Sequence, residues 1–143
     1  MEREDLGALF ARITRRLMNA EQPLLAAHGL SMWGYAVLTH LGQRPAETQQ
    51  EIARGIGYDK TRLIALLDGL EADGLVVRKP DPSDRRARTV RLTLAGVARL
   101  AAAQADIRTM EEELLAELTA TEKRSLLAVL PRLAYADQPA DPS

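Results

Sequence analysis

The sequence predicts a mainly α-helical fold with one small β-hairpin. Apolar residues recur at three- and four-residue spacing over most of the chain, which is the period of helices buried on one face. A turn-rich stretch at residues 80–88 lies between two short strand-like runs, 75–77 and 89–93, as in a pair of antiparallel strands. With 143 residues, 46% of them apolar, the chain can bury a core as one domain or one closely fused pair.

Two helices are expected in the N-terminal part of the chain. The first covers residues 4–28; Pro23 is expected to bend or divide it, and Gly29 is expected to end it. The second begins after Ser31, a favourable N-cap residue, and continues to about Leu41.

A pair of helices, the first of them short, follows, joined by a glycine-containing turn. Thr48 and Glu51 have the spacing of a capping box at the start of the first helix, which ends at residues 55–57. Asp59 can cap the second helix, which ends at Gly74. Two helices joined in this way are typical of a helix-turn-helix.

The predicted hairpin is strongly cationic. Between residues 78 and 91, six Lys and Arg residues stand against two Asp residues, in a chain whose net charge is −1. A charge run in isolation is more often solvated surface. Because this one directly follows a helix-turn-helix, it predicts a wing that contacts the phosphate backbone or the minor groove of DNA. The sequence therefore predicts a winged helix-turn-helix domain at residues 31–93 that binds double-stranded DNA.

Contacts with DNA are expected from three elements. The second helix of the pair enters the major groove with its first turn nearest the base edges, the first helix meets phosphates, and the wing reaches the minor groove. The predicted contact residues are Lys60, Thr61 and Arg62 on the recognition helix, Gln49 and Gln50 on the supporting helix, and Arg85, Arg86 and Arg88 on the wing.

Further apolar helices predict a dimer. A long helix at residues 94–118, capped by Thr93, is followed by one at 122–136 that Pro131 is expected to bend. Their apolar surface exceeds what a small winged helix needs, so residues 1–30 and 94–136 are expected to form a helical dimerisation region, with 137–143 as a flexible tail. The alternative is a monomer whose helices fold back on its own core.

The hairpin resembles the wing of the MarR-type family of winged helix-turn-helix transcriptional regulators. The resemblance rests on residues 74–86 and on 90–96, which end in Leu-Thr-x-x-Gly, and residues 30–38 and 122–130 are similar to other helices of that family. It implies a homodimer that acts as a repressor, less often as an activator, on pseudo-palindromic DNA sites. In many members a small aromatic ligand releases the DNA.

The resemblance also implies roles for particular residues. Asp84 would organise the wing, and Arg86 would be its main minor-groove arginine. Asp59 is hypothesised to pair with Arg86 and so to tie the wing to the recognition helix. Many family members carry a hydroxyl residue and an arginine where this chain has Ile64 and Ala65, so base readout is expected to shift to the start of the helix.

A small-molecule site is the least constrained prediction. The only tryptophan and both histidines lie near the second helix, and an aromatic acid assisted by Arg15 or Arg16 would suit them. The alternative is that these rings pack a core or an interface. The candidate pocket residues are Met18, His28, Trp33, Tyr35 and His40.

Other classes of protein find little support. The chain has no cysteine and two histidines, which argues against disulfides and a metal sensor, and no catalytic triad or phosphate-binding glycine loop indicates an enzyme or a cofactor. No signal peptide or membrane span is predicted, so a cytoplasmic location is expected. The alternatives left open are an architectural DNA-binding protein without ligand response, a winged-helix protein-interaction module, and the dimerisation domain of a larger enzyme.

Overall fold

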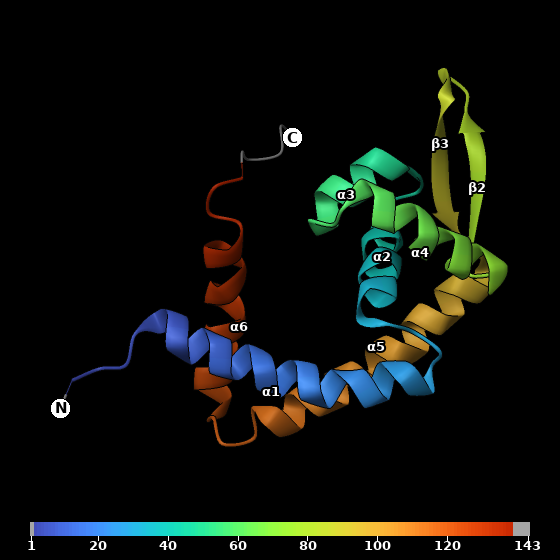
Figure 1. The fold of residues 1–143 in the computed structure, drawn as a ribbon. Coiled ribbons are helices and arrows are strands. Elements are labelled where there is room, and N and C mark those ends of the chain that lie inside the picture. Colours follow the sequence, from blue (N-terminus) through green and yellow to red (C-terminus); the bar gives the residue numbers. More distant parts are fainter. Residues whose placement is uncertain (1, 139–143) are drawn as a thin grey trace. The chain divides into compact units, whose positions relative to one another are not determined.

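The computed structural model describes residues 2–138 (Figure 1). Within them lie six helices and three strands, in the order α1 (Leu6–Ala27), α2 (Met32–Gly42), β1 (Glu47–Thr48), α3 (Gln49–Ile56), α4 (Lys60–Ala72), β2 (Val76–Asp81), β3 (Asp84–Leu92), α5 (Leu94–Leu114) and α6 (Ala120–Ala134). The chain divides into two compact units, residues 1–108 and 109–143. The predicted class, mainly α with a small β-hairpin wing, is confirmed.

The first unit is built on a core shared by α2, α3, α4 and the sheet. The three strands are antiparallel in the order β1-β3-β2, and β2 pairs with β3 from Val76 opposite Leu92. The side chains that exclude water between the helices and the sheet are Leu38, Ile52, Leu63, Leu67, Leu75 and Val90, all with less than 2% exposure. Burying side chains of this size stabilises the fold by about 1.5–3 kcal/mol each, which fixes α4 against the base of the hairpin.

Four of the predicted helix caps are confirmed. The side-chain oxygens of Ser31, Thr48, Asp59 and Thr93 each accept a hydrogen bond from the backbone amide three residues later, at 2.9–3.1 Å. Glu51 also accepts from the amide of Thr48 and completes the capping box. These contacts span only three residues, so the sequence pattern was sufficient to find them.

Pro23 was expected to bend or divide the first helix, and division is wrong because α1 continues through Pro23 to Ala27. A proline inside a helix removes one hydrogen bond, and the contacts around this end of α1 hold it in place. Leu25 is 1% exposed. In the turn that follows, His28 Nε2 lies 2.6 Å from Asp106 Oδ2 and Arg99 donates to the His28 carbonyl at 2.8 Å.

The hairpin is longer than predicted. Residues 80–88 were expected to be a loop, but β2 continues to Asp81, β3 begins at Asp84, and the turn is only residues 82–83. Pro80 is tolerated within the strand because β2 is an edge strand, where a missing N–H leaves no partner unsatisfied. The register shifts between residues 80 and 81, which marks a bulge next to the turn. The two-residue strand β1 was missed, since so short a segment carries no periodic signal.

The last two helices also differ from prediction. Helix α5 ends at Leu114 instead of residue 118, and α6 begins at Ala120 instead of 122 because Thr119 and Glu122 form a second capping box. The predicted tail, 137–143, lies mostly outside the described residues. None of the helices in residues 2–138 has the length and apolar character needed to span a membrane.

Candidate nucleic-acid interface

The first turn of α4 presents the predicted recognition residues to solvent. Lys60, Thr61 and Arg62 are all exposed, directly after the N-cap Asp59. A helix N-terminus carries a partial positive charge and free N–H groups, which favour an approach to phosphates. The carboxylate of Asp59 accepts from the amide of Arg62 at 2.9 Å. No ion pair between Asp59 and Arg86 is present in residues 2–138, so the structure gives Asp59 the role of a helix cap.

The wing, residues 76–92 of β2, β3 and their turn, projects beside α4 (Figure 1). Arg85, Arg86 and Arg88 are exposed at its outer end. The register of the two strands shifts between the pairs Pro80–Arg88 and Asp81–Asp84, so Arg85 and Arg86 lie in the irregular part of β3 next to the turn. The wing tip therefore presents three exposed guanidinium groups within four residues.

Two aspartates hold the wing tip. Asp84 Oδ1 accepts from the amide of Arg86 at 3.0 Å, a contact compatible with the expected role of Asp84 in organising the wing. Asp81 Oδ1 accepts from both the amide and the hydroxyl of Ser83, each at 2.9 Å. The sequence analysis did not single out Asp81 as an organising residue. An Asp whose side chain accepts from the amide two residues later forms an Asx turn, and the Asp-Pro-Ser sequence at residues 81–83 is compatible with one.

Arg78 stabilises the contact between the wing and α4 and contributes little to the cationic surface. Its guanidinium contacts the carboxylates of Asp68 and Glu71 on α4 and donates to the Gln49 side chain at 3.4 Å; only 10% of the Arg78 side chain is exposed. Its charge is compensated by two carboxylates, so it adds little to the field of the wing. Gln49 is held by the same cluster and Gln50 is exposed, which leaves Gln50 as the freer of the two predicted phosphate contacts.

The Arg78 cluster predicts a pH effect on stability. The side-chain hydrogen bond from Arg78 holds the pKa of Glu71 below its ordinary value of 4.5, against an opposing effect of desolvation. A carboxyl group whose pKa is lower in the folded protein than in the unfolded chain stabilises the fold. This contribution is fully present above pH 4.5 and is lost as the pH falls through the pKa of the folded state. We expect Glu71→Gln to be less stable than the wild type near pH 7 by a small amount, since Glu71 is exposed.

That difference should shrink between pH 5 and about pH 3, when measured by urea unfolding at a series of pH values. A gap between wild type and Glu71→Gln that stays constant over this range would contradict the role given to the hydrogen bond.

Tyr58, in the turn between α3 and α4, was not singled out from the sequence. Its ring centroid lies 4.4 Å from that of Trp33 on α2, with the planes inclined by 32°. The guanidinium carbon of Arg62 lies 5.3 Å from the Tyr58 ring centroid, within the range of a cation–π contact. In the sequence, Tyr58 is recognisable only as an aromatic residue directly before the helix N-cap Asp59. That position does not indicate its contact with Trp33, which is distant in the sequence.

The predicted ligand residues are only partly brought together. Met18 and Trp33 line one cleft of about 610 Å³ between α1 and α2, along with Leu25, Leu30 and Ala36. The other three candidates do not line it. His28 pairs with Asp106, and His40 Nε2 lies 3.0 Å from Glu47 Oε2 with 9% of its side chain exposed. Tyr35 likewise lies outside the lining.

No Lys or Arg among the described residues lines this cleft. The predicted cation Arg15 lines a neighbouring groove of α1, and Met18 and Gln22 belong to both. A ring held in the cleft and a carboxylate directed along α1 would be compatible with this arrangement, whereas Arg16 lines neither.

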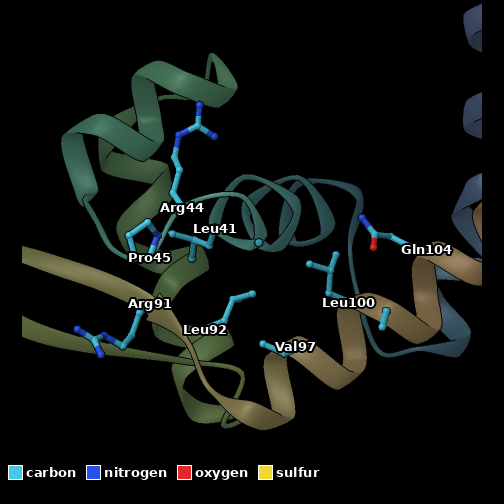
Figure 2. A pocket seen from close by; sticks show the side chains of 10 residues that line it. Leu41, Arg44, Pro45, Arg91, Leu92, Val97, Leu100 and Gln104 are labelled. Carbon is cyan, nitrogen blue, oxygen red and sulfur yellow. The ribbon is translucent and has the colours of Figure 1, made fainter. Parts of the chain in front are cut away.

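A second cleft, of about 450 Å³, lies where the end of α2, the base of β3 and the start of α5 meet (Figure 2). Leu92, Val97 and Leu100 supply apolar walls, while the guanidinium groups of Arg44 and Arg91 extend away from them. Arg44 Nε also pairs with Glu47 at 3.0 Å. Within residues 2–138, no group of three or more His, Asp or Glu side chains is placed to hold a metal ion.

A helix-turn-helix whose second helix begins with exposed polar side chains, next to an arginine-tipped hairpin, defines a winged-helix DNA-binding protein. Residues 28–87 match the MarR family. This chain belongs to the MarR family of transcriptional regulators.

Similar proteins agree with this assignment. The putative transcriptional regulatory protein for the hcr operon of Thauera aromatica is 26% identical over 126 residues, which cover 88% of this chain and 72% of that protein. The transcriptional repressor CouR, solved on a 23-mer DNA duplex, is 32% identical with a TM-score of 0.82, covering 94% of this chain and 99% of CouR. A Mycobacterium tuberculosis MarR family protein in complex with DNA is 27% identical with a TM-score of 0.80, covering 92% and 98%.

Proposed function

We propose that this protein is a homodimeric repressor that binds a pseudo-palindromic operator and is released by a small aromatic acid. The observation that carries the DNA-binding part is the joint exposure of Arg85, Arg86 and Arg88 on the wing and of the first turn of α4, within one compact unit. The helix supplies base contacts in the major groove, and the wing supplies charge for the adjacent minor groove and its phosphates.

Apolar side chains left in solvent support the homodimer. On α1, Leu6 and Phe10 are 57% and 46% exposed; on α6, Leu127 and Leu133 are 52% and 68% exposed. Monomeric proteins rarely leave several large apolar side chains of one helix uncovered, and a second copy with two-fold symmetry would cover those on each helix. Residues 1–30 and 94–136 are thus the proposed dimerisation region, and 31–93 the proposed DNA-binding domain.

The repressor role and the effector rest on separate support. CouR, a similar protein, is a repressor bound to DNA. The cleft beside Trp33 is apolar and of a size that accommodates one aromatic ring with a short acidic side chain. An acid that binds there and favours a conformation with lower DNA affinity would release the operator.

A footprint on the DNA upstream of the protein's own gene tests the proposal. We expect protection of two half-sites about 34 Å apart, because a two-fold dimer presents two recognition helices one helical turn apart. Affinity for this DNA should exceed that for random duplex by about a thousandfold or more, and should fall steeply with added salt. Sedimentation of the free protein should give the mass of two chains.

Equal affinity for random and upstream duplex would instead indicate an architectural DNA-binding protein. A single protected half-site with a monomeric mass would refute the dimer and leave the DNA contact intact. An absence of DNA binding at low salt would favour a protein-interaction module.

A further inference from the structure

The turn between α3 and α4 contains an aromatic contact that joins two regions of different proposed function. The Tyr58 ring contacts the Trp33 ring at a centroid distance of 4.4 Å and the Arg62 guanidinium at 5.3 Å. Trp33 lines the cleft of about 610 Å³, and Arg62 lies in the first turn of the recognition helix. One tyrosine ring therefore lies between the wall of the cleft and a predicted base-reading side chain.

Arg62 is restrained at two points. Its backbone amide donates to the N-cap carboxylate of Asp59 at 2.9 Å, and its guanidinium lies over the Tyr58 ring. An exposed arginine loses considerable side-chain entropy when it becomes ordered on DNA. A ring that holds the guanidinium near one orientation before binding reduces that cost, which is the physical meaning of preorganisation.

The exposed part of the Trp33 side chain is available to a ligand in the cleft. Trp33 is 42% exposed, although it lies in ring contact with Tyr58. Offset ring pairs have a preferred geometry, so a ligand ring that packs against Trp33 and tilts it would alter the Trp33–Tyr58 contact. Any such change alters the surface on which Arg62 rests.

We propose that Tyr58 is a positioning residue that couples Trp33 in the cleft wall to Arg62 on the recognition helix, so that an aromatic acid in the cleft weakens operator binding through this ring contact. The inference rests on the proposed function and specifies how its effector acts. It requires that the acid bind the free protein more tightly than the operator complex, and by linkage the operator must weaken the acid to the same extent.

A double-mutant cycle tests the link between Tyr58 and Arg62. Tyr58→Leu, which keeps apolar volume and removes the ring, should lower operator affinity about two- to fivefold, the range of an exposed cation–π contact. The same change in an Arg62→Gln background should have almost no effect, and Tyr58→Phe, which keeps the ring, should retain wild-type affinity. Equal losses from Tyr58→Leu in both backgrounds would overturn the positioning role.

The only tryptophan of the chain gives a direct readout of the cleft. Wild type and Tyr58→Leu are titrated with benzoate, phenylacetate and 3-phenylpropionate, and Trp33 emission and operator affinity are followed together. An acid that changes Trp33 emission in both proteins should lower operator affinity about two- to fivefold less in Tyr58→Leu than in wild type, because the effect that passes through the ring contact cannot exceed what that contact contributes.

Equal release of both proteins, or a panel in which no acid changes both emission and operator affinity, would overturn the coupling. The footprint of the wild-type protein tests the proposed function separately from Tyr58. If the wild-type protein does not bind its upstream DNA more tightly than random duplex, the proposed function is refuted whatever the Tyr58 variants show.

Discussion

Replacing Arg85 and Arg86 together with alanine is expected to lower affinity for the upstream DNA by about a hundredfold or more, because well-placed arginine contacts contribute roughly 1–3 kcal/mol each. Both side chains are exposed at the wing tip. The slope of log affinity against log salt should also fall by about two, since two fewer counterions are displaced. Fluorescence anisotropy with a labelled duplex at several salt concentrations measures both quantities.

The tip should still fold in this variant, because its hydrogen bonds use the Asp84 and Asp81 side chains and backbone amides. Arg124→Ala with Arg132→Ala removes the same charge from α6, which lies in the proposed dimerisation region. Once sedimentation shows that this variant is still a dimer, its salt slope should stay at the wild-type value. Unchanged affinity in a folded Arg85→Ala/Arg86→Ala protein would refute the wing as a DNA contact.

Gly96→Ala is expected to destabilise the protein by about 3 kcal/mol or more, at the upper end of overpacking effects. A Cβ at Gly96 would lie 2.1 Å from the carbonyl oxygen of Leu75, a backbone atom that cannot rotate away. The same carbonyl accepts from the Thr93 amide at 3.1 Å, and the Thr93 hydroxyl donates to the Gly74 carbonyl at 2.6 Å. The clash therefore separates the start of α5 from the base of the wing. Thermal and urea unfolding would measure the loss.

Gly69→Ala is the informative control. Gly69 lies inside α4 with no atom within 4 Å of an added Cβ, so alanine there should stabilise by about 0.4–1 kcal/mol through a smaller loss of backbone entropy. Opposite signs for the two glycine variants would support the packing argument. A Gly96→Ala protein of wild-type stability would show that the close approach to Leu75 is not maintained in solution.

Local interactions made much of the fold predictable. Ser31, Thr48 and Asp59 cap helices through amides three residues away, so their identity and spacing suffice to place the starts of α2, α3 and α4. The same holds for the alternation that predicted β3 and for the exposed arginines at its tip. The length of the hairpin was underestimated because Pro80 reads as a strand breaker unless the strand is known to be at an edge.

The candidate site was predictable only in part. His28 and His40 were expected in a ligand pocket, yet each has a carboxylate partner, Asp106 and Glu47. The partner of His28 is 78 residues away in the sequence. Arg78 was counted with the wing cations, although Asp68 and Glu71 compensate it. A charge count along the chain cannot distinguish a paired cation from a free one.

The sequence by itself determined the order of the helices, four of their caps, the cationic hairpin and the class of the protein, because each depends on residues within a few positions of one another. Only the tertiary structure decided that Arg78 fastens α4 to the base of the wing and that Tyr58 lies between Trp33 and Arg62. Those contacts join segments that become neighbours only when α2, α3, α4 and the sheet close on one buried core.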